Sequence, residues 1–239
     1  MKVLVFDIYG DYAHFRKYYT TTSPLTFSFP PPPTIYGIIG AIYGVPKSEN
    51  LNIFGYDNCK VALQILNPVK KVRMGVNLIN TKDNKYFILL KARNHEPRTQ
   101  IRTEFVKFPK YRIYLTHQEQ EIFKKLTEFI QHHKCFFTVS LGLSELLANF
   151  YFVGLYECDE VKNYAGYINT IIPISKLGER GIIIEPDKKY FKEKIPIKMS
   201  PDRVVEIYGD AVYESDGKPI KANINLVHQL KNGATITFF

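Results

Sequence analysis

The sequence of 239 residues predicts an α+β fold, in which a mixed α/β N-terminal part carries a basic β-hairpin and a mostly β part follows. Strand-like and helix-like segments alternate along residues 1–160, and short apolar strands separated by turns fill residues 161–239. Positive charge is concentrated in one segment, residues 70–112, which sets the expected hairpin apart from the rest of the chain.

The first expected strand is KVLVFDIY at residues 2–9, a nearly continuous apolar run typical of a strand that is covered on both faces. A polar and aromatic loop follows and ends at four prolines, residues 30–33, which donate no backbone hydrogen bonds. Thr34 is expected to cap a helix over IYGIIGAIYG, which Gly44 ends. Glycines at spacings of three and four on this helix predict a close approach to another backbone.

Residues 60–66 predict a second strand, and the basic segment holds two more, at 86–90 and 103–115. We expect these two to form a hairpin that projects from the domain, because charged residues occur too often for its interior to be a core. The clearest helix is residues 117–133, which carries one apolar face. Further strands are expected at 138–140 and 150–157, and then in the segments TIIPIS, GIIIEP, EKIPIKM, RVVEIYGDAVYE, KANINLVHQ and ATITFF.

This element order fits a ferredoxin-like or RRM-like antiparallel domain over residues 1–160, with the hairpin, or thumb, inserted at about 70–115. Residues 161–239 are expected to form a β-rich C-terminal part. No apolar run reaches the length of a membrane helix, and the acidic residues Asp7 and Asp11 argue against a signal peptide. The sequence therefore predicts a cytoplasmic protein with no membrane partner.

The distribution of charge points to a polyanion as the partner. Residues 70–112 hold twelve Lys/Arg and three acidic residues, a surplus equal to the net charge of +9 of the whole chain. Such a segment repels itself unless a polyanion covers it. A solvated basic surface, or an edge strand charged against aggregation, is the simpler alternative. Neither alternative requires twelve cations in one segment, so we favour nucleic-acid binding.

Motifs for catalysis are missing from the sequence. It contains no G-x-S-x-G, H-E-x-x-H, Walker A or G-x-G-x-x-G pattern. The cysteines lie far apart with no metal-ligand spacing, and acidic residues are too sparse near the basic segment for a two-metal nuclease. We therefore expect no catalysis, no metal, no cofactor and no small-molecule substrate.

Candidate RNA contacts come from two regions. In the loop HFRKYYTTTS, cations stand beside aromatic rings, which can bind phosphates and stack bases together. In the basic segment, cations at alternate positions share one strand face, spaced about 6.6 Å apart, close to the span of one extended nucleotide. The expected RNA-binding residues are Tyr12, His14, Arg16, Lys17, Tyr36, Tyr43, Arg73, Lys91, Arg93, Arg98, Arg102, Lys107, Lys110 and Arg112.

Two N-terminal segments, FDIYGDYAHFRK and PPPPTIYGIIGAIYG, resemble the opening of the Cas5 family of CRISPR-associated proteins, in the RAMP superfamily. The matching positions are Gly10, Ala13, Phe15 and Arg16 in the first segment, and Pro32, Thr34, Gly37, Gly40, Ala41 and Gly44 in the second. Further on, RTQIRTE with KYRIYL is similar to the family's thumb, and LGLSELLA and MSPDRVVEIY are similar to later elements. The resemblance spans nearly the whole chain.

The resemblance implies a subunit of a type I Cascade surveillance complex, most like type I-B, that acts in antiviral defence. In that family an RRM-like domain and a β thumb hold the 5′ handle of the crRNA, beside the backbone and large subunits. One subtype, I-C, instead cuts the repeat as a metal-independent ribonuclease with a Tyr and a Lys-His pair. Tyr43 stands where that Tyr would, but the chain has no Lys-His dipeptide, since Lys134 follows His132-His133. Ribonuclease activity is therefore the alternative, and a generic RRM-like protein is a third, although no RNP1-like motif occurs.

Overall fold

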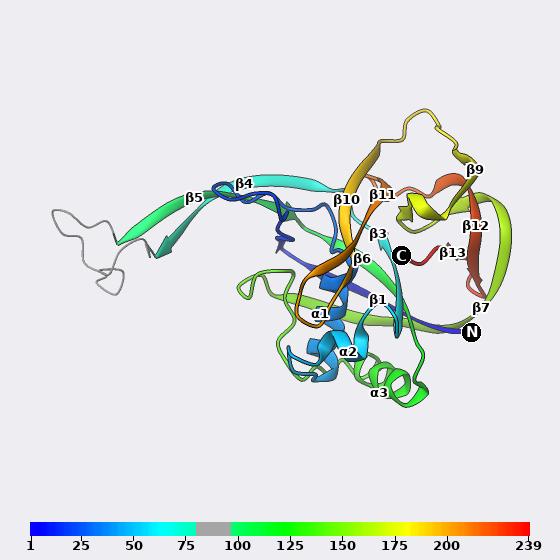
Figure 1. The fold of residues 1–239 in the computed structure, drawn as a ribbon, viewed down its shortest axis with the longest axis horizontal. Coiled ribbons are helices and arrows are strands. Elements are labelled where there is room, and N and C mark those ends of the chain that lie inside the picture. Colours follow the sequence, from blue (N-terminus) through cyan, green and yellow to red (C-terminus); the bar gives the residue numbers. More distant parts are fainter. Residues whose placement is uncertain (80–96) are drawn as a thin grey trace.

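The computed structural model describes residues 1–79 and 97–239, and it is built mainly of antiparallel β-structure with few helices (Figure 1). The largest sheet has the strand order β13-β12-β7-β1-β6-β3, and β9 also pairs with β12. All these pairs are antiparallel, and the sheet curls at the β12 end. The strands are β1 (Lys2–Gly10), β3 (Cys59–Ile65), β6 (Lys110–His117), β7 (Ala148–Ile168), β9 (Leu177–Ile182), β12 (Ile220–Leu230) and β13 (Thr235–Ile236).

The expected central strand is confirmed, because β1 lies between β6 and β7 and its residues 3–8 are all buried. Its side chains alternate between two apolar clusters, as the period of two in a strand requires. One cluster contains Leu4, Phe6 and Ile8, and the other contains Val3 and Val5. An apolar run without alternation is thus explained by cover on both faces of the sheet.

Three helices, α1 (Pro32–Tyr43), α2 (Asn50–Phe54) and α3 (Gln120–Gln131), cover the first of these faces. The expected cap of α1 at Thr34 is wrong by three residues, because the helix begins at Pro32 with Pro31 as the N-cap. Proline suits the first turn, where its fixed φ is helical and its missing N–H is not needed. The helix ends as expected at Gly44, whose φ of +94° is the left-handed conformation of a C-cap.

The opposite face of the sheet is covered at one end only. There Leu230, Ile236 and Phe238 from the C-terminal segment pack on Val3 and Val5. Towards the other end of the same face, where β1 reaches Gly10, the side chains are polar or aromatic and partly exposed. This uncovered end lies next to the start of β6 and the start of β7.

A two-stranded ribbon extends away from the body of the molecule (Figure 1). It consists of β4 (Lys70–Ile79) and β5 (Arg98–Lys107), paired antiparallel, and β2 (Tyr12–Ala13) pairs with the inner end of β5. The sequence missed β4, and it was wrong to predict one strand over 103–115. The chain instead makes β5 and β6, interrupted at Phe108-Pro109, where Phe108 has a φ of +49° and proline has no N–H to pair. The expected strand at 86–90 lies outside the described residues.

The C-terminal part forms a second sheet, in the order β10 (Tyr190–Met199), β11 (Val205–Glu214) and β8 (Ile172–Pro173). Along the chain, the short 3₁₀ helix η1 (Ile174–Lys176) comes directly after β8. The expected strands EKIPIKM, RVVEIYGDAVYE and KANINLVHQ are found as β10, β11 and β12. TIIPIS and ATITFF contain only the two-residue strands β8 and β13, and the strand expected at GIIIEP is wrong in its bounds, because β9 ends at Ile182. The expected strand at 138–140 is wrong, since the structure has only an isolated bridge between Ser140 and Leu147 there. Strand β7 is much longer than expected and passes through residue 160, pairing first with β1 and then with β12.

Among the residues that the structure describes, no helix has the length and apolarity needed to span a bilayer.

Candidate nucleic-acid interface

The ribbon has one basic and one apolar face. In the register of β4 and β5, Arg73 is opposite Glu104, Gly75 is opposite Arg102, and Ile79 is opposite Arg98. These pairs alternate with apolar ones, so Arg73, Arg98 and Arg102 share a face. The other face carries Val72, Met74, Val76, Ile101 and Phe105, an apolar side that the sequence analysis did not describe.

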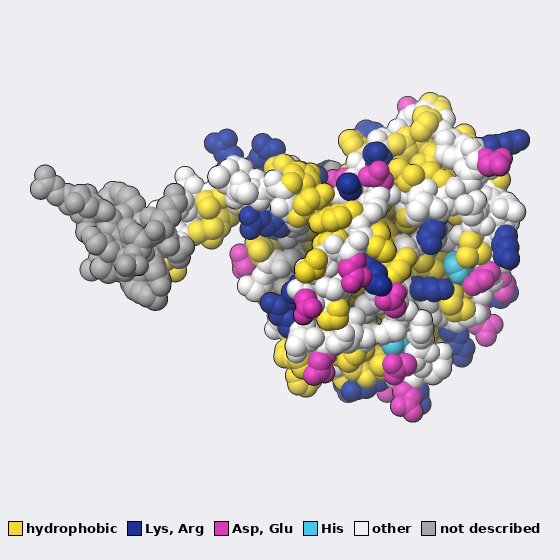
Figure 2. All heavy atoms as spheres, in the orientation of Figure 1, with side chains coloured by type: hydrophobic (Ala, Val, Ile, Leu, Met, Phe, Trp, Pro, Cys, Tyr) yellow, Lys and Arg dark blue, Asp and Glu magenta, His cyan; other side chains and the backbone are white. Residues whose placement is uncertain are grey.

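Acidic residues neutralise the cations at the inner end of the ribbon. The Lys71 ammonium lies 3.7 Å from carboxylate oxygens of both Glu104 and Glu193, and Arg73 Nε lies 3.4 Å from Glu104 Oε2. Further out, neither Arg98 nor Arg102 has an acidic partner within 4.0 Å in the described ranges 1–79 and 97–239. Within the described part of the ribbon, the cations without an acidic partner thus lie towards its outer end. Figure 2 shows Lys and Arg side chains where the ribbon leaves the body.

The N-terminal loop is fastened to the inner end of the ribbon. Lys17 Nζ lies 3.2 Å from Glu193 Oε1. Burial works against the charged form of Lys17, but the Glu193 carboxylate outweighs it and raises the pKa of this lysine above its ordinary value. Glu193 is itself buried and accepts hydrogen bonds from the backbone N–H and the hydroxyl of Ser28, at 3.1 and 3.0 Å. The loop, β4 and β10 therefore meet at one carboxylate.

The predicted residues of this loop differ in accessibility. Arg16 is exposed, and its Nη2 donates to the Thr20 carbonyl at 3.0 Å. Tyr12 is half-buried, with its ring edge-on to Phe105 at 6.2 Å. His14 is buried, and its Nδ1 hydrogen-bonds the Glu104 carbonyl at 2.7 Å. The Arg16 side chain is thus accessible from solvent, whereas His14 holds the loop against the ribbon, and the roles of both in RNA contact stay predictions.

Tyr36 and Tyr43 belong to α1, on the helical side of the sheet, and are not brought together with the ribbon. Tyr36 is buried and donates its hydroxyl hydrogen to the Cys59 carbonyl at 3.2 Å, and burial raises its pKa well above the ordinary value. The Tyr43 ring packs against Phe54 at 5.3 Å, and the Lys125 ammonium lies 4.5 Å from the ring centroid. The roles of both tyrosines in RNA contact, and of Tyr43 in cleavage, stay predictions.

Arg112 and Lys110 lie on the uncovered end of the sheet. The Arg112 guanidinium makes two hydrogen bonds to Asp7, Nε to Oδ1 at 2.7 Å and Nη2 to Oδ2 at 3.0 Å. These bonds raise the pKa of Arg112 further above its ordinary value and neutralise its charge. The Tyr151 hydroxyl donates a third bond to Asp7, at 2.6 Å. Lys110 extends over the Tyr151 ring, 5.4 Å from its centroid.

Sequence reasoning missed three aromatic residues at this end, Tyr9, Phe108 and Tyr151, which are 37%, 53% and 40% exposed. The signal was present for Tyr9, because the positions Val3, Val5, Asp7 and Tyr9 of one strand point to one face. No local signal could show that Tyr151 joins them, since it lies 144 residues from Asp7. Lys107 is exposed beside Phe108, with its ammonium 5.0 Å from the ring centroid. Lys91 and Arg93 lie outside the described residues.

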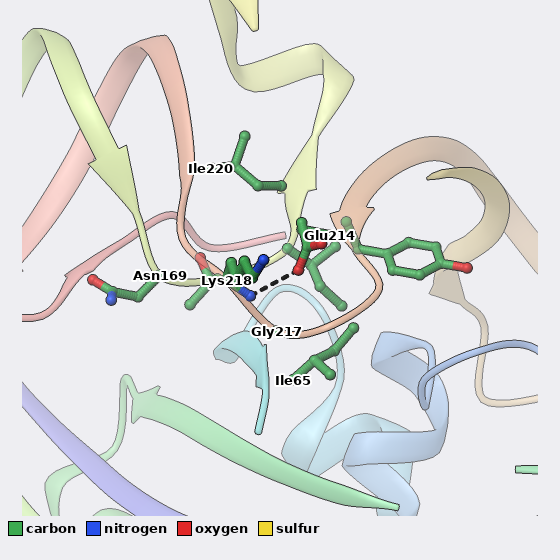
Figure 3. Close-up of a pocket in the computed structure, with 9 residues that line it drawn as sticks. Ile65, Asn169, Glu214, Gly217, Lys218 and Ile220 are labelled. Carbon is green, nitrogen blue, oxygen red and sulfur yellow. Dashed lines mark hydrogen bonds between the residues drawn. The ribbon is translucent and has the colours of Figure 1, made fainter. Parts of the chain in front are cut away.

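A small cavity next to Glu214 is a structural feature and no candidate site (Figure 3). It encloses only about 10 Å³, room for a single water at most. The buried Glu214 carboxylate accepts hydrogen bonds from the backbone N–H groups of Lys189, Asp216 and Lys218, at 3.0, 2.9 and 2.8 Å. These hydrogen bonds fix the turn at Gly217, which has a φ of +81°.

No group of three or more His, Cys, Asp or Glu side chains suited to a metal ion occurs within residues 1–79 and 97–239.

One comparison with known proteins identifies a family, and a second identifies similar folds. The sequence pattern of the family described as CRISPR-associated protein (Cas_Cas5) matches residues 3–199. A crystal structure of a CRISPR protein from Archaeoglobus fulgidus is similar, with a TM-score of 0.58 at 14% identity, over 99% of this chain and 98% of that one. A chain of a CRISPR RNA-guided surveillance complex has a TM-score of 0.54 at 8% identity, over 92% and 91%. At such identities the likeness shows the fold alone. No curated protein matches the sequence significantly.

Proposed function

This chain belongs to the CRISPR-associated Cas5 family, and on that premise we propose that it is an RNA-binding subunit of a type I CRISPR effector complex, one that holds the 5′ handle of the guide RNA. The observation that carries the proposal is the ribbon's basic face. Arg98 and Arg102 lie there four residues apart along β5, roughly 13 Å on an extended strand. An extended RNA backbone laid along this face would meet a cation about every second nucleotide.

The arrangement of the sheet supports the finer expectation of a ferredoxin-like RAMP domain. Strands β1, β3, β6 and β7 stand in the order β7-β1-β6-β3, with α1 between β1 and β3 and α3 between β6 and β7 along the chain. That is the order of a split β-α-β fold. In this interpretation the ribbon is the thumb, since it is inserted between the second and third strands of the domain. The division into residues 1–160 and 161–239 stays part of the proposal.

The proposed role is binding. Arg98 and Arg102, which pair with no acidic residue of the ranges 1–79 and 97–239, lie on a protruding surface and not in a pocket, which suits a ligand that is held along its backbone. Arg16 lies at the inner end of the same ribbon and extends the basic path towards the body. We propose the backbone and large subunits of the complex as protein partners, and the cytoplasm as its location.

Reversing the charge of the ribbon tests the proposal. The full chain with Arg98→Glu and Arg102→Glu is expressed in its host, and guide RNA that copurifies is measured. We expect RNA retention to be abolished. For purified protein and single-stranded RNA, the slope of log K against log salt should flatten by about 0.7 for each phosphate that the variant no longer neutralises.

The matched control reverses two exposed lysines of the helical side, Lys124→Glu and Lys134→Glu, which changes the net charge by the same amount. This control should retain guide RNA, because the proposal places no RNA contact on the helical side. If loss of positive charge acted non-specifically, both variants would lose guide RNA equally. Guide RNA that copurifies unchanged with the Arg98/Arg102 variant would refute the proposal.

Incubating the protein with repeat RNA in EDTA tests the alternative function. A metal-independent ribonuclease would release a cleavage product, and a Tyr43→Phe variant would not.

A further inference from the structure

The uncovered end of the main sheet carries an exposed aromatic surface that the ribbon does not explain. In the antiparallel register, Tyr9 of β1 is opposite Lys110 of β6 and Asn149 of β7. Asp7, one row away on the same face, is opposite Tyr151. The Tyr9 and Tyr151 rings are therefore neighbours on one face, with centroids 6.2 Å apart and planes at 60°.

These rings line a groove of about 720 Å³, together with Phe108 from the turn between β5 and β6. We call Tyr9, Phe108, Lys110 and Tyr151 the aromatic surface. Its three rings are each more than a third exposed, and none of them belongs to a buried cluster of the described residues. Exposed aromatic area that contributes nothing to the core indicates a surface for binding.

Tyr151 is held in place before any ligand arrives. Its hydroxyl donates to Asp7 Oδ2 at 2.6 Å, and Asp7 is fully buried and fixed by two bonds from Arg112. Phe108 is fixed by its backbone, whose N–H donates to the Asp11 carbonyl at 2.7 Å and whose carbonyl accepts from Asn67 Nδ2 at 3.1 Å. A ligand that stacks on these rings therefore costs little ordering entropy.

Cations accompany the rings. The ammonium groups of Lys110 and Lys107 lie 5.4 and 5.0 Å from the centroids of Tyr151 and Phe108. Aromatic faces beside lysines are the combination that binds single-stranded nucleic acid, because the ring takes the base and the ammonium takes the phosphate. One lining carboxylate, Asp11, can accept a hydrogen bond from a base edge or a ribose hydroxyl.

We propose that the aromatic surface stacks one or two unpaired bases of the bound RNA, continuing its path from the ribbon onto the body of the protein. The inference rests on the proposed function, because it assigns the next part of the same RNA. Continuity supports this occupant: Lys107 ends β5, Lys110 begins β6, and Phe108-Pro109 joins them, so the inner end of the ribbon adjoins the groove. Lys107 lies on the ribbon face opposite to Arg98 and Arg102, so the RNA would cross from one face to the other at this end.

The test compares full-length variants in binding a short single-stranded RNA of mixed sequence, followed by fluorescence anisotropy at several salt concentrations. In the double variant Tyr9→Ala/Tyr151→Ala, affinity should fall by about fivefold to a hundredfold for each base unstacked. The salt slope should stay the same, since no phosphate contact is removed. Tyr151→Phe keeps the ring and should bind nearly as the natural protein does, which separates stacking from the hydroxyl bond to Asp7.

Tyr167→Ala is the matched control, because Tyr167 lies on the same strand β7, is 48% exposed, and has the Lys188 ammonium 4.9 Å from its centroid. It should leave RNA affinity unchanged. Equal affinity for the natural protein and the Tyr9/Tyr151 double variant, or an equal loss with Tyr167→Ala, would overturn the inference while leaving the proposed function intact. The inference would also be overturned if the Tyr9/Tyr151 double variant kept its RNA affinity but no longer copurified with other Cas subunits. The aromatic surface would then be a contact for a protein. A natural protein that binds no RNA at all would refute both.

Discussion

Asp7 is a carboxylate in the middle of the central strand, with no exposed surface, and its environment explains how the fold tolerates it. Its hydrogen bonds come from two side chains: both oxygens accept from Arg112, and Oδ2 also accepts from Tyr151. Arg112 keeps 28% of its side chain exposed, so only one partner of the pair is fully withdrawn from water. A buried charge of this kind is tolerable only while its hydrogen bonds are complete.

Removing one partner of this pair should therefore cost more than removing both. Arg112→Met leaves the buried Asp7 unpaired and is expected to lower the free energy of unfolding by about 3–5 kcal/mol. In an Asp7→Leu background the same Arg112→Met change should cost much less, since no buried charge is left. Urea unfolding of the natural protein, both single variants and the double variant gives the coupling energy directly.

Lys110→Met, on the same strand, supplies the control for that cycle. Its ammonium pairs with no described acidic residue and is not part of the Asp7 network, so the change should alter stability by less than about 1 kcal/mol. An Arg112→Met cost that is the same with and without Asp7 would contradict the expected coupling.

At the scale of single elements, helix α1 shows how glycine spacing is used. The sequence predicted that its glycines permit a close approach to another backbone. In the structure Gly40 and Gly37 differ in this respect. A Cβ at Gly40 would lie 1.8 Å from Asn50 Oδ1 of α2, whereas a Cβ at Gly37 would meet nothing within 4 Å. Asn50 is buried and donates from Nδ2 to the Tyr36 carbonyl at 3.1 Å, so it joins α2 to α1.

Alanine at these two positions should have opposite effects. Gly40→Ala displaces the Asn50 side chain from its bond to Tyr36 and is expected to destabilise the protein by about 1–3 kcal/mol. Gly37→Ala places a methyl group in open space and should stabilise α1 by up to about 1 kcal/mol, through helix propensity. Thermal unfolding of the two variants decides this, and a Gly40→Ala variant at least as stable as Gly37→Ala would show that α2 can move away freely.

The whole molecule is held together by contacts between its N-terminal and C-terminal parts. The principal apolar cluster includes Ile195 and Tyr213 from β10 and β11 as well as residues of β1, α1 and α3. Glu193 adds a polar junction, because it bonds Ser28 of the N-terminal loop and pairs with Lys17 and with Lys71 of β4. The root of the ribbon is thus fixed by a residue that lies far from it along the chain.

Neutralising this junction should loosen distant segments together. Glu193→Gln removes the partner of the half-buried Lys17 and should lower the free energy of unfolding by about 1.5–3 kcal/mol, as for hydrogen bonds to charged groups. Amide hydrogen exchange should become faster in β4 and β10 alike. The neighbouring Lys192→Gln breaks only an exposed pair with Asp210 and should change little. Faster exchange confined to β10 would show that the ribbon's root does not depend on Glu193.

Local patterns in the sequence determined a large part of this protein: the central strand from an apolar run, α3 from its apolar face, the end of α1 from Gly44, the C-terminal strands, and the segment that carries the surplus charge. These features depend on neighbours a few residues apart, so a single sequence contains them. Tertiary structure alone decided which cations of the described ranges have acidic partners and which rings are exposed. Glu193 reaches Lys17 across 176 positions, and Tyr151 reaches Asp7 across 144. The physical reason is that pairing and burial are set by strand order and register, which bring together residues whose separation along the chain leaves no local pattern.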